Sequence, residues 1–388
     1  MPSARHTLPM PMPNTAMPAP GRAAFLFLLA GCAPAAGARP DWSAREAAPP
    51  VTSAPPSSVD ITWLSVTNVY LRVGSLGVLT DGYVTRLPKS AFVDQTLARS
   101  PAAYRPDSAA VARVATMLGG RDAVQALLNG HSHFDHAFDA AMWAKSTRAE
   151  VYGPRSTCYQ LAAQDVPASR CTAVEGGETL TLGDGVAVHV VRWNHSGDHA
   201  VNPELHDPRE LAGVPTRDPA TGGLRPGVTE DFPNGGGSRA YLITVATGGR
   251  PLTIFFSNTG SPVDLDQPIV VDGKNFGAPI DDLRAALRDA GLASVDLWIA
   301  GGGAPLARLV LPVLRPKAYL PVHWDDFYSP LEAGVAKPFA DPALESLLDS
   351  AGVALVRPTQ YLDRWRLDRS GVRAVANDAQ KRALGLPR

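Results

Sequence analysis

Three histidines and an aspartate lie within six residues in the middle of the chain. His131, His133, Asp135 and His136 form the phrase HSHFDH, although the 388 residues include only nine histidines. The phrase directly follows AVQALLN, an apolar run that predicts a buried strand. Imidazole nitrogens and carboxylate oxygens are donors that zinc prefers, and residues two apart in an extended turn point the same way. The phrase therefore predicts that His131 and His133 hold one ion, while Asp135 and His136 turn toward a second.

The body of the chain alternates short β-rich runs with helical segments. Strands are predicted in ITWLSVTNVYLRV and GVLTDGYVTRL, and hairpins in ETLTL with VAVHVVRW and in RAYLITV with LTIFFSN. Asp107 is expected to cap a helix whose apolar positions, from Val111 to Leu118, recur at helical spacing before Gly119. Two β-rich blocks, each followed by helices, predict two sheets packed face to face with helices outside.

Four segments are predicted along the chain. Residues 1–31 are expected to be a signal peptide, 32–58 a flexible linker, 59–370 one folded domain and 371–388 a C-terminal tail. Within the domain, residues 199–238 are rich in Pro, Gly, Asn and Asp. They far exceed the ordinary connection of about 4 to 6 residues. We therefore expect a lid-like loop there.

The one strongly apolar run, Ala23 to Gly31, is too short to span a membrane as a helix, which needs about 20 residues. It fits the apolar region of an export signal. The run leads into Cys32, and LAGC resembles the end of a bacterial lipoprotein signal. That resemblance implies cleavage before Cys32 and a lipid on its thiol. An ordinary export signal that contains a cysteine is the alternative. We expect an exported protein, periplasmic or on the cell surface, that is lipid-anchored to a bacterial membrane.

Two further cysteines, Cys158 and Cys171, are thirteen positions apart. An even number of cysteines in an exported chain permits a disulfide, and two unpaired buried thiols are the alternative. Neither cysteine has the spacing of a redox or zinc motif.

The charge balance excludes some classes of partner. The chain has 36 Lys plus Arg and 37 Asp plus Glu, a formal net charge of −1. No surface for nucleic acid or for an anionic membrane is indicated. Membrane contact is expected only through the lipid anchor.

The phrase HSHFDH matches every fixed position of the signature His-x-His-x-Asp-His. The chain therefore resembles the metallo-β-lactamase superfamily of metallohydrolases over about residues 61–368. The resemblance implies an α+β fold, a four-layer αβ/βα sandwich. It also implies two later ligands at strand ends. His195, after VAVHVVRW, would complete the first metal site, and His323, in PVHWDDF, would complete the second.

One position departs from the family pattern. The family usually has a carboxylate that bridges the two metals at the end of the second hairpin, whereas this chain reads FFSNTGS, with Asn258. A neutral amide is a weaker bridging ligand, so the second ion should be held less tightly and the centre should favour an anionic substrate. A carboxylate reaching in from Asp264 or Asp266, a single bound ion and a misaligned position are the alternatives.

The resemblance implies a hydrolase that uses one or two Zn²⁺ ions, although iron and manganese take similar ligands. Such ions lower the pKa of bound water from ~15.7 towards about 7 and so supply metal-bound hydroxide at neutral pH. Asp135 is implied both to ligate a metal and to orient this hydroxide. The phrases HSHFDHAFDA, NHSGDH and PVHWDDF are most similar to the branch of the ascorbate phosphate lactonases and the N-acyl phosphatidylethanolamine phospholipase D. The expected substrate is a small ester, lactone or phosphodiester, of anionic character.

Other polar residues lie near the expected ligands in sequence. His199 is expected to bind substrate or donate a proton, because it lies four residues beyond His195 at the start of the long loop. Asp325 and Asp326 either fix the imidazoles or are surface carboxylates. Two histidines are expected to be ordinary, one within a strand and one facing solvent: His189 and His206.

Two other functions stay open. Export and an unbridged ligand set suggest a β-lactamase. Asn258 suggests a non-catalytic surface lipoprotein that keeps the fold as a binding module.

Overall fold

The computed structural model describes residues 56–93, 96–198 and 200–386. All of these described residues belong to one compact unit. The predicted signal peptide, most of the predicted linker and Cys32 lie outside the described residues. Among the described residues, no helix combines the length and the apolar character needed to cross a membrane.

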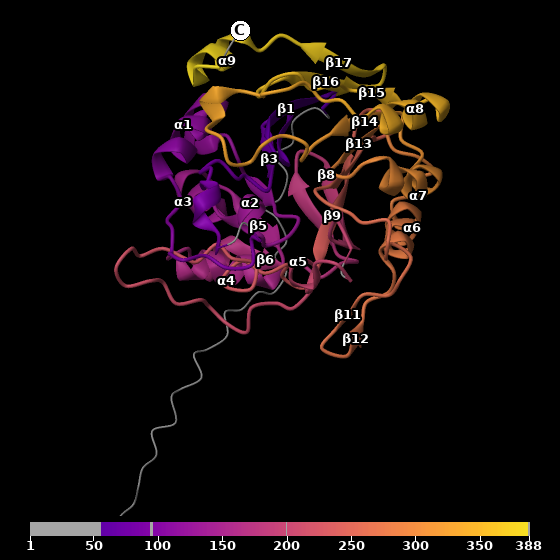
Figure 1. Cartoon of the computed structure of the whole chain (residues 1–388). Helices are drawn as coiled ribbons and strands as arrows, with labels where there is room; N and C mark the ends of the chain where they lie inside the picture. Colours follow the sequence, from indigo (N-terminus) through magenta and orange to yellow (C-terminus); the bar gives the residue numbers. More distant parts are fainter. Residues whose placement is uncertain (1–55, 94–95, 199, 387–388) are drawn as a thin grey trace, which may run out of the picture. The chain divides into compact units, whose positions relative to one another are not determined.

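Two β-sheets pack face to face within this unit (Figure 1). The first sheet has eight strands in the order β17-β16-β1-β2-β3-β4-β5-β6, and the second has seven in the order β15-β14-β13-β10-β9-β8-β7. The strands of the first sheet are β1 (Val59–Ser65), β2 (Asn68–Val73), β3 (Leu76–Thr80), β4 (Ala126–Leu128), β5 (Glu150–Gly153), β6 (Cys171–Ala173), β16 (Arg364–Asp368) and β17 (Gly371–Val375). Those of the second are β7 (Thr179–Gly183), β8 (Val186–Trp193), β9 (Ser238–Val245), β10 (Leu252–Ser257), β13 (Leu297–Ala300), β14 (Ala318–Pro321) and β15 (Ala354–Leu355). A separate hairpin joins β11 (Val270–Val271) and β12 (Lys274–Asn275).

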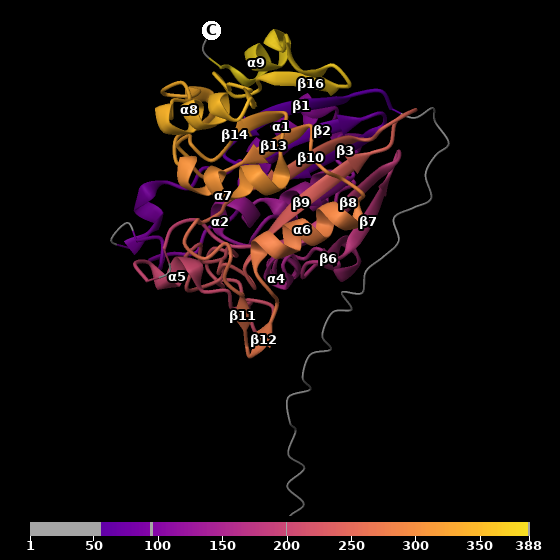
Figure 2. The same ribbon diagram turned by 90° about the vertical axis from the view of Figure 1, so that its right-hand side faces the viewer.

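Helices cover the outer faces of both sheets. α1, α3 and α4 lie on the first sheet, and α6, α7 and α8 lie on the second (Figures 1 and 2). The α-helices are α1 (Ser108–Leu118), α2 (Phe134–Ala137), α3 (Ala140–Ser146), α4 (Arg155–Ala163), α5 (Pro203–His206), α6 (Pro279–Asp289), α7 (Ala304–Leu314), α8 (Pro342–Ser350) and α9 (Asp378–Leu384). Short 3₁₀ turns occur at Lys89–Ala91, Gly120–Asp122, Ala168–Arg170 and Leu331–Ala333. These four layers confirm the expected αβ/βα sandwich.

The core has two main parts. One includes Trp63 of β1 and Ile243 of β9 between the sheets and extends to the helices on the first sheet. The other lies between the second sheet and its helices and includes Trp298 and Val310. Because both faces of the second sheet are covered, its central strands are apolar on both sides. All six residues of β10, LTIFFS, are buried.

The expected start and end of α1 are confirmed. The Asp107 carboxylate accepts hydrogen bonds from the backbone N–H groups of Ala109 and Ala110, which the first turn of a helix leaves without partners. The helix ends at Gly119, whose φ of 127° disfavours other residues.

The run ITWLSVTNVYLRV, expected to be one strand, contains two. The backbone turns at Val66, where φ is 44°, so β1 and β2 pair as a hairpin. The apolar character of the run does not reveal this turn, because Val66 is itself fully buried.

The C-terminal residues that were expected to form a tail contain a strand and a helix. Of residues 371–386, β17 pairs with β16 at the edge of the first sheet, and α9 packs near α1. The tail prediction missed β17 because an edge strand exposed on one face lacks a continuous apolar pattern.

Cys158 of α4 and Cys171 of β6 form the predicted disulfide. The bridge closes a short loop, with a sequence separation of 13. Restricting a loop of this size in the unfolded chain contributes about 3 kcal/mol. We expect the double variant Cys158→Ala/Cys171→Ala to lose about that much free energy of unfolding in urea denaturation. The reduced wild-type chain should match the variant, and an unchanged urea midpoint would contradict the prediction.

Candidate metal centre

The predicted ligands lie at one edge of the two sheets, beyond the ends of several strands. The phrase that begins at His131 follows β4, His195 follows β8, and His323 follows β14. β4 runs parallel to β3 in the first sheet, and β10, β13 and β14 run parallel in the second. Carboxyl ends of parallel strands meet at the same edge, where side chains from distant parts of the sequence can converge.

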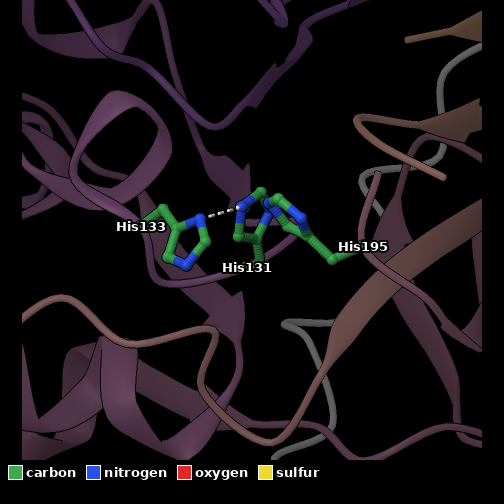
Figure 3. Close-up of side chains that lie close together, drawn as sticks. All are labelled: His131, His133 and His195. Atoms are coloured by element: carbon green, nitrogen blue, oxygen red, sulfur yellow. Dashed lines mark hydrogen bonds between the residues drawn. The ribbon is translucent and has the colours of Figure 1, made fainter. Parts of the chain in front are cut away.

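His131, His133 and His195 form one group of donors. One nitrogen of each ring lies within 4.8 Å of the others, and Figure 3 shows the three rings close together. His131 Nε2 lies 3.1 Å from His133 Nδ1. His195 Nδ1 lies 2.9 Å from the carbonyl oxygen of Ser196, which leaves Nε2 for the group. Three converging imidazoles with no carboxylate among them fit a divalent cation such as zinc.

Asp135, His136 and His323 form a second group, also with donors within 4.8 Å of one another. Asp135 Oδ2 lies 3.4 Å from His136 Nε2 and 3.3 Å from His323 Nε2. Asp135 and His136 occupy the first turn of α2. His323 has a φ of 60°, and its backbone N–H donates to the carbonyl of Val66. The β1–β2 turn thus helps to hold this residue in a conformation that is uncommon outside glycine.

Asp81 was not among the predicted site residues. Its carboxylate contacts His136 of the second group directly and reaches the first group through Asn258. Asp81 directly follows β3, is fully buried and has a φ of 52°. Its Oδ2 lies 3.0 Å from His136 Nδ1, so the Nε2 of that ring faces Asp135. The carboxylate also accepts four other hydrogen bonds, from Thr67 Oγ1 (2.6 Å), Asn258 Nδ2 (3.0 Å), Asn129 Nδ2 (3.2 Å) and Gly130 N (2.7 Å). A carboxylate in this place fixes the orientation of a ligand imidazole.

Asn258 contacts one histidine of each donor group. Its Nδ2 lies 3.1 Å from His131 Nδ1 and 3.3 Å from His136 Nδ1. These are the ring nitrogens opposite those that face the other donors. A Cβ at position 130 would lie only 2.1 Å from this amide, which explains the glycine there. Asn258 Oδ1 is buried and has no hydrogen-bond partner among the described residues. The bridging role of Asn258 therefore stays a prediction, with a neutral amide oxygen where the family usually has a carboxylate.

The two alternative carboxylates lie elsewhere. Asp264 Oδ1 accepts a hydrogen bond of 2.5 Å from Asn194 Nδ2. Asp266 is exposed and accepts from Gln267 Nε2. Neither carboxylate belongs to the two donor groups of the described residues.

Asn258→Asp tests the contact with Asp81. In the metal-free chain, a second buried carboxylate would lose the amide donor and repel Asp81 at about 3.0 Å. We expect the free energy of unfolding of the metal-free protein to fall by about 3 kcal/mol. Zinc should recover most of the loss, because a carboxylate is the better metal ligand. Asn258→Ala is the control that removes the donor without adding charge. Equal stability of the metal-free Asn258→Asp and wild-type chains would contradict this account.

Burial sets the protonation of the first group. Desolvation, reinforced by the neighbouring histidines, lowers the pKa of His131 and His195 well below the usual value. Burial lowers the pKa of His133 to about 3, against the opposing effect of Asp135. The neutral imidazole is the form that binds a metal, so the folded chain presents this group ready for an ion.

In the second group, charged neighbours outweigh burial in setting the pKa values. Burial opposes protonation of His136, but the carboxylates of Asp135 and Asp81 outweigh it and raise its pKa. Burial would raise the pKa of Asp135, yet His136 and His323 lower it well below its usual range. Asp135 is therefore ionised throughout the neutral range.

These shifts predict that acid destabilises the metal-free protein. A histidine whose folded-state pKa is lowered contributes stability above about pH 6.5, which is lost as the pH falls. Between pH 6.5 and 5, His133 alone should cost about 2 kcal/mol, because it stays neutral in the folded state. His136 acts oppositely, but its contribution is fully present below pH 6.5 and is lost only at higher pH. Urea denaturation at the two pH values measures the loss, and His133→Asn should reduce it.

Several other predicted residues lie away from the donor groups. His199 lies outside the described residues, so its predicted role stays a prediction. Asp325 Oδ2 accepts from the backbone N–H of Val66, and Asp326 from that of Tyr328, so neither of these hydrogen bonds orients a ligand imidazole. His189 lies beside Thr179 in the β7–β8 hairpin, as expected of a strand histidine.

The position of His206 differs from the prediction. It was predicted to face solvent, but it is only partly exposed, and its ring centroid lies 5.2 Å from that of His195. The sequence gives little signal for this contact, because the long loop brings His206 back toward the site over eleven residues without a periodic pattern.

Relatives match only part of the chain. No protein-family model matches it. A protein from Myxococcus xanthus, named a metal-dependent hydrolase, is 33% identical over 94 residues, which are 24% of this chain and 32% of that protein. A metal-dependent hydrolase from Pyrobaculum islandicum is 31% identical over 72 residues, 19% of this chain and 32% of that protein. The chain thus spans about a third of the length of the curated relatives that it matches.

Among solved structures, a metallo hydrolase from the archaeon Ignicoccus hospitalis aligns over 80% of this chain and 99% of that chain, with 14% identity and a TM-score of 0.45. The chain's own architecture carries the fold assignment, namely two facing sheets, helices outside both, and the phrase HSHFDH directly beyond β4. The chain therefore has an αβ/βα sandwich of the metallo-β-lactamase type.

Proposed function

We propose that the chain is a zinc-dependent hydrolase with two ion sites, one at each donor group. The observation that carries this proposal is the convergence of six side chains, from positions 131 to 323, into two groups of three donors. Five imidazoles and one carboxylate are the ligand types that zinc prefers. The partial relatives named metal-dependent hydrolases support the same class of activity.

When bound, ions at such sites lower the pKa of a water ligand and polarise a substrate oxygen. The chain's own residues supply the geometry. Asp135, kept ionised between His136 and His323, can accept a hydrogen bond from the attacking water and orient it. Asp81 holds His136 in one orientation. Because Asn258 offers a neutral amide in place of a carboxylate, we propose that the second ion is held more weakly than the first.

We further propose that the chain is exported and anchored through Cys32. The disulfide between Cys158 and Cys171 supports export, since disulfides persist in oxidising compartments. The proposed substrate is a small ester, lactone or phosphodiester. Part of the long loop, at residues 203–208, lines a cavity beside His195 and would contribute to specificity.

The test is a hydrolysis screen of the purified chain with and without zinc. Aryl esters, γ-lactones and bis-aryl phosphodiesters cover the three classes of bond, and nitrocefin tests the β-lactam alternative. We expect zinc-dependent turnover in at least one of the three proposed classes. A chain that holds two zinc ions and cleaves none of these bonds would overturn the proposed function.

A further inference from the structure

A cavity of about 690 Å³ opens beside His195. One wall comes from residues 203–208 of the long loop, and the other from residues 263–270, which follow β10 and reach the β11–β12 hairpin. His195 therefore belongs both to the first donor group and to the lining of this cavity. A substrate whose reacting bond lies at the donor groups has room to extend here.

The walls of the cavity are largely apolar. Pro203 and Pro208 line it on the loop side, and Val263, Ile269 and Val270 on the other. Val263 and Val270 are 50% and 53% exposed, so two large apolar side chains face solvent on the same wall. Exposed apolar side chains that gather along a concave surface mark a binding site more often than scattered ones do.

The charged side chains of the lining are acidic. Asp207 and Asp264 line the cavity, and no Lys or Arg does so among the described residues. Burial would raise the pKa of Asp207, but its hydrogen bonds with Arg209 lower it, so this carboxylate is ionised at neutral pH. Asp207 is already paired with Arg209, which does not line the cavity, so the described part of the lining offers no Lys or Arg to bind an anionic group.

We infer that this cavity binds an uncharged, apolar arm of the substrate, such as the alkyl chain of a medium-length ester or lactone. The inference rests on the proposed function and deepens it by naming the substrate class. It also revises the expectation of an anionic substrate, because an anionic group of the substrate would have to lie outside this cavity.

Kinetics with a matched series test the inference. We compare 4-nitrophenyl acetate, butyrate and hexanoate on the zinc-loaded chain, and the corresponding γ-alkyl lactones if only lactones are cleaved. Each added methylene that leaves water should raise kcat/KM about threefold to fourfold, or about a hundredfold from acetate to hexanoate. The hexanoate analogue that ends in a carboxylate should lose this gain.

Two variants test whether the chain-length preference arises in this cavity. Val263→Asp and Val270→Asp place a charge on the cavity wall and should each reduce the hexanoate advantage by about tenfold. Val214→Asp is the matched control, because Val214 is 45% exposed in the same long loop but does not line the cavity. The control should keep the wild-type preference. A preference that survives both cavity variants would overturn the inference.

Binding to the metal-free chain separates this inference from the proposed function. Ligand-observed NMR with 1-hexanol reports on the cavity without any hydrolysis. Binding that is weakened by Val263→Asp but not by Val214→Asp would support the apolar site even if no ester were cleaved. Turnover without chain-length preference, together with no hexanol binding, would overturn the apolar site while the hydrolase proposal stands.

Discussion

The His131→Ala variant is expected to hold at most one zinc ion per chain and to hydrolyse its best substrate more than about a hundredfold more slowly than the wild-type chain. His131 supplies one of three donors in a group with no carboxylate, so its loss leaves two imidazoles to hold a dication. Its ring also contacts Asn258 and His133, so removal loosens two neighbours of the site.

His189→Ala is the control for this variant. His189 is likewise a histidine, but it lies in β8 of the second sheet, beside Thr179 and outside both donor groups. It should keep both zinc ions and the wild-type kcat/KM, within about twofold. Circular dichroism and urea denaturation establish that both variants fold. Full activity in a folded, zinc-treated His131→Ala chain would contradict the proposed centre.

Asp81→Ala should have the largest effect on stability. The carboxylate is fully buried and makes five hydrogen bonds, so its removal leaves several buried donors without an acceptor. We expect the free energy of unfolding to fall by about 4 kcal/mol. Zinc affinity at the second group should fall by about 10-fold to 100-fold, because His136 loses the partner that orients it.

Asp81→Asn separates the two consequences. It keeps the shape and one acceptor oxygen but loses the charge, so it should recover part of the stability while zinc affinity stays reduced. Isothermal titration of the metal-free variants with zinc measures the affinity. An Asp81→Ala chain that binds zinc as tightly as wild type would show that Asp81 does not position the ligand.

The sequence predicts most of the donor set, because the signal is local. His131, His133, Asp135 and His136 lie within one strand end and the following turn, and their spacing carries the geometry. The two distant histidines could be predicted only through the resemblance. Each follows a recognisable strand, but nothing in the local pattern shows that the strands share an edge.

Asp81 could not be predicted for the same reason. An aspartate before glycine at the end of a strand is an ordinary turn signal. Its role depends on the parallel pairing of β3 with β4, in which Thr80 lies opposite Leu128. Only that pairing brings the Asp81 carboxylate into contact with the backbone N–H of Gly130 and with the ring of His136. The orientation of Asn258 beside His131 and His136 likewise depends on packing against Gly130.

The most direct measurement is the number of zinc ions that the purified full chain retains after dialysis against zinc-containing and then metal-free buffer, determined by elemental analysis together with protein concentration. We expect about two ions before metal-free dialysis, a selective loss of the more weakly held one, and at most one in the His323→Ala chain. A folded wild-type chain that never holds a single equivalent of zinc, iron or manganese would contradict the central claim that these six side chains form a metal centre.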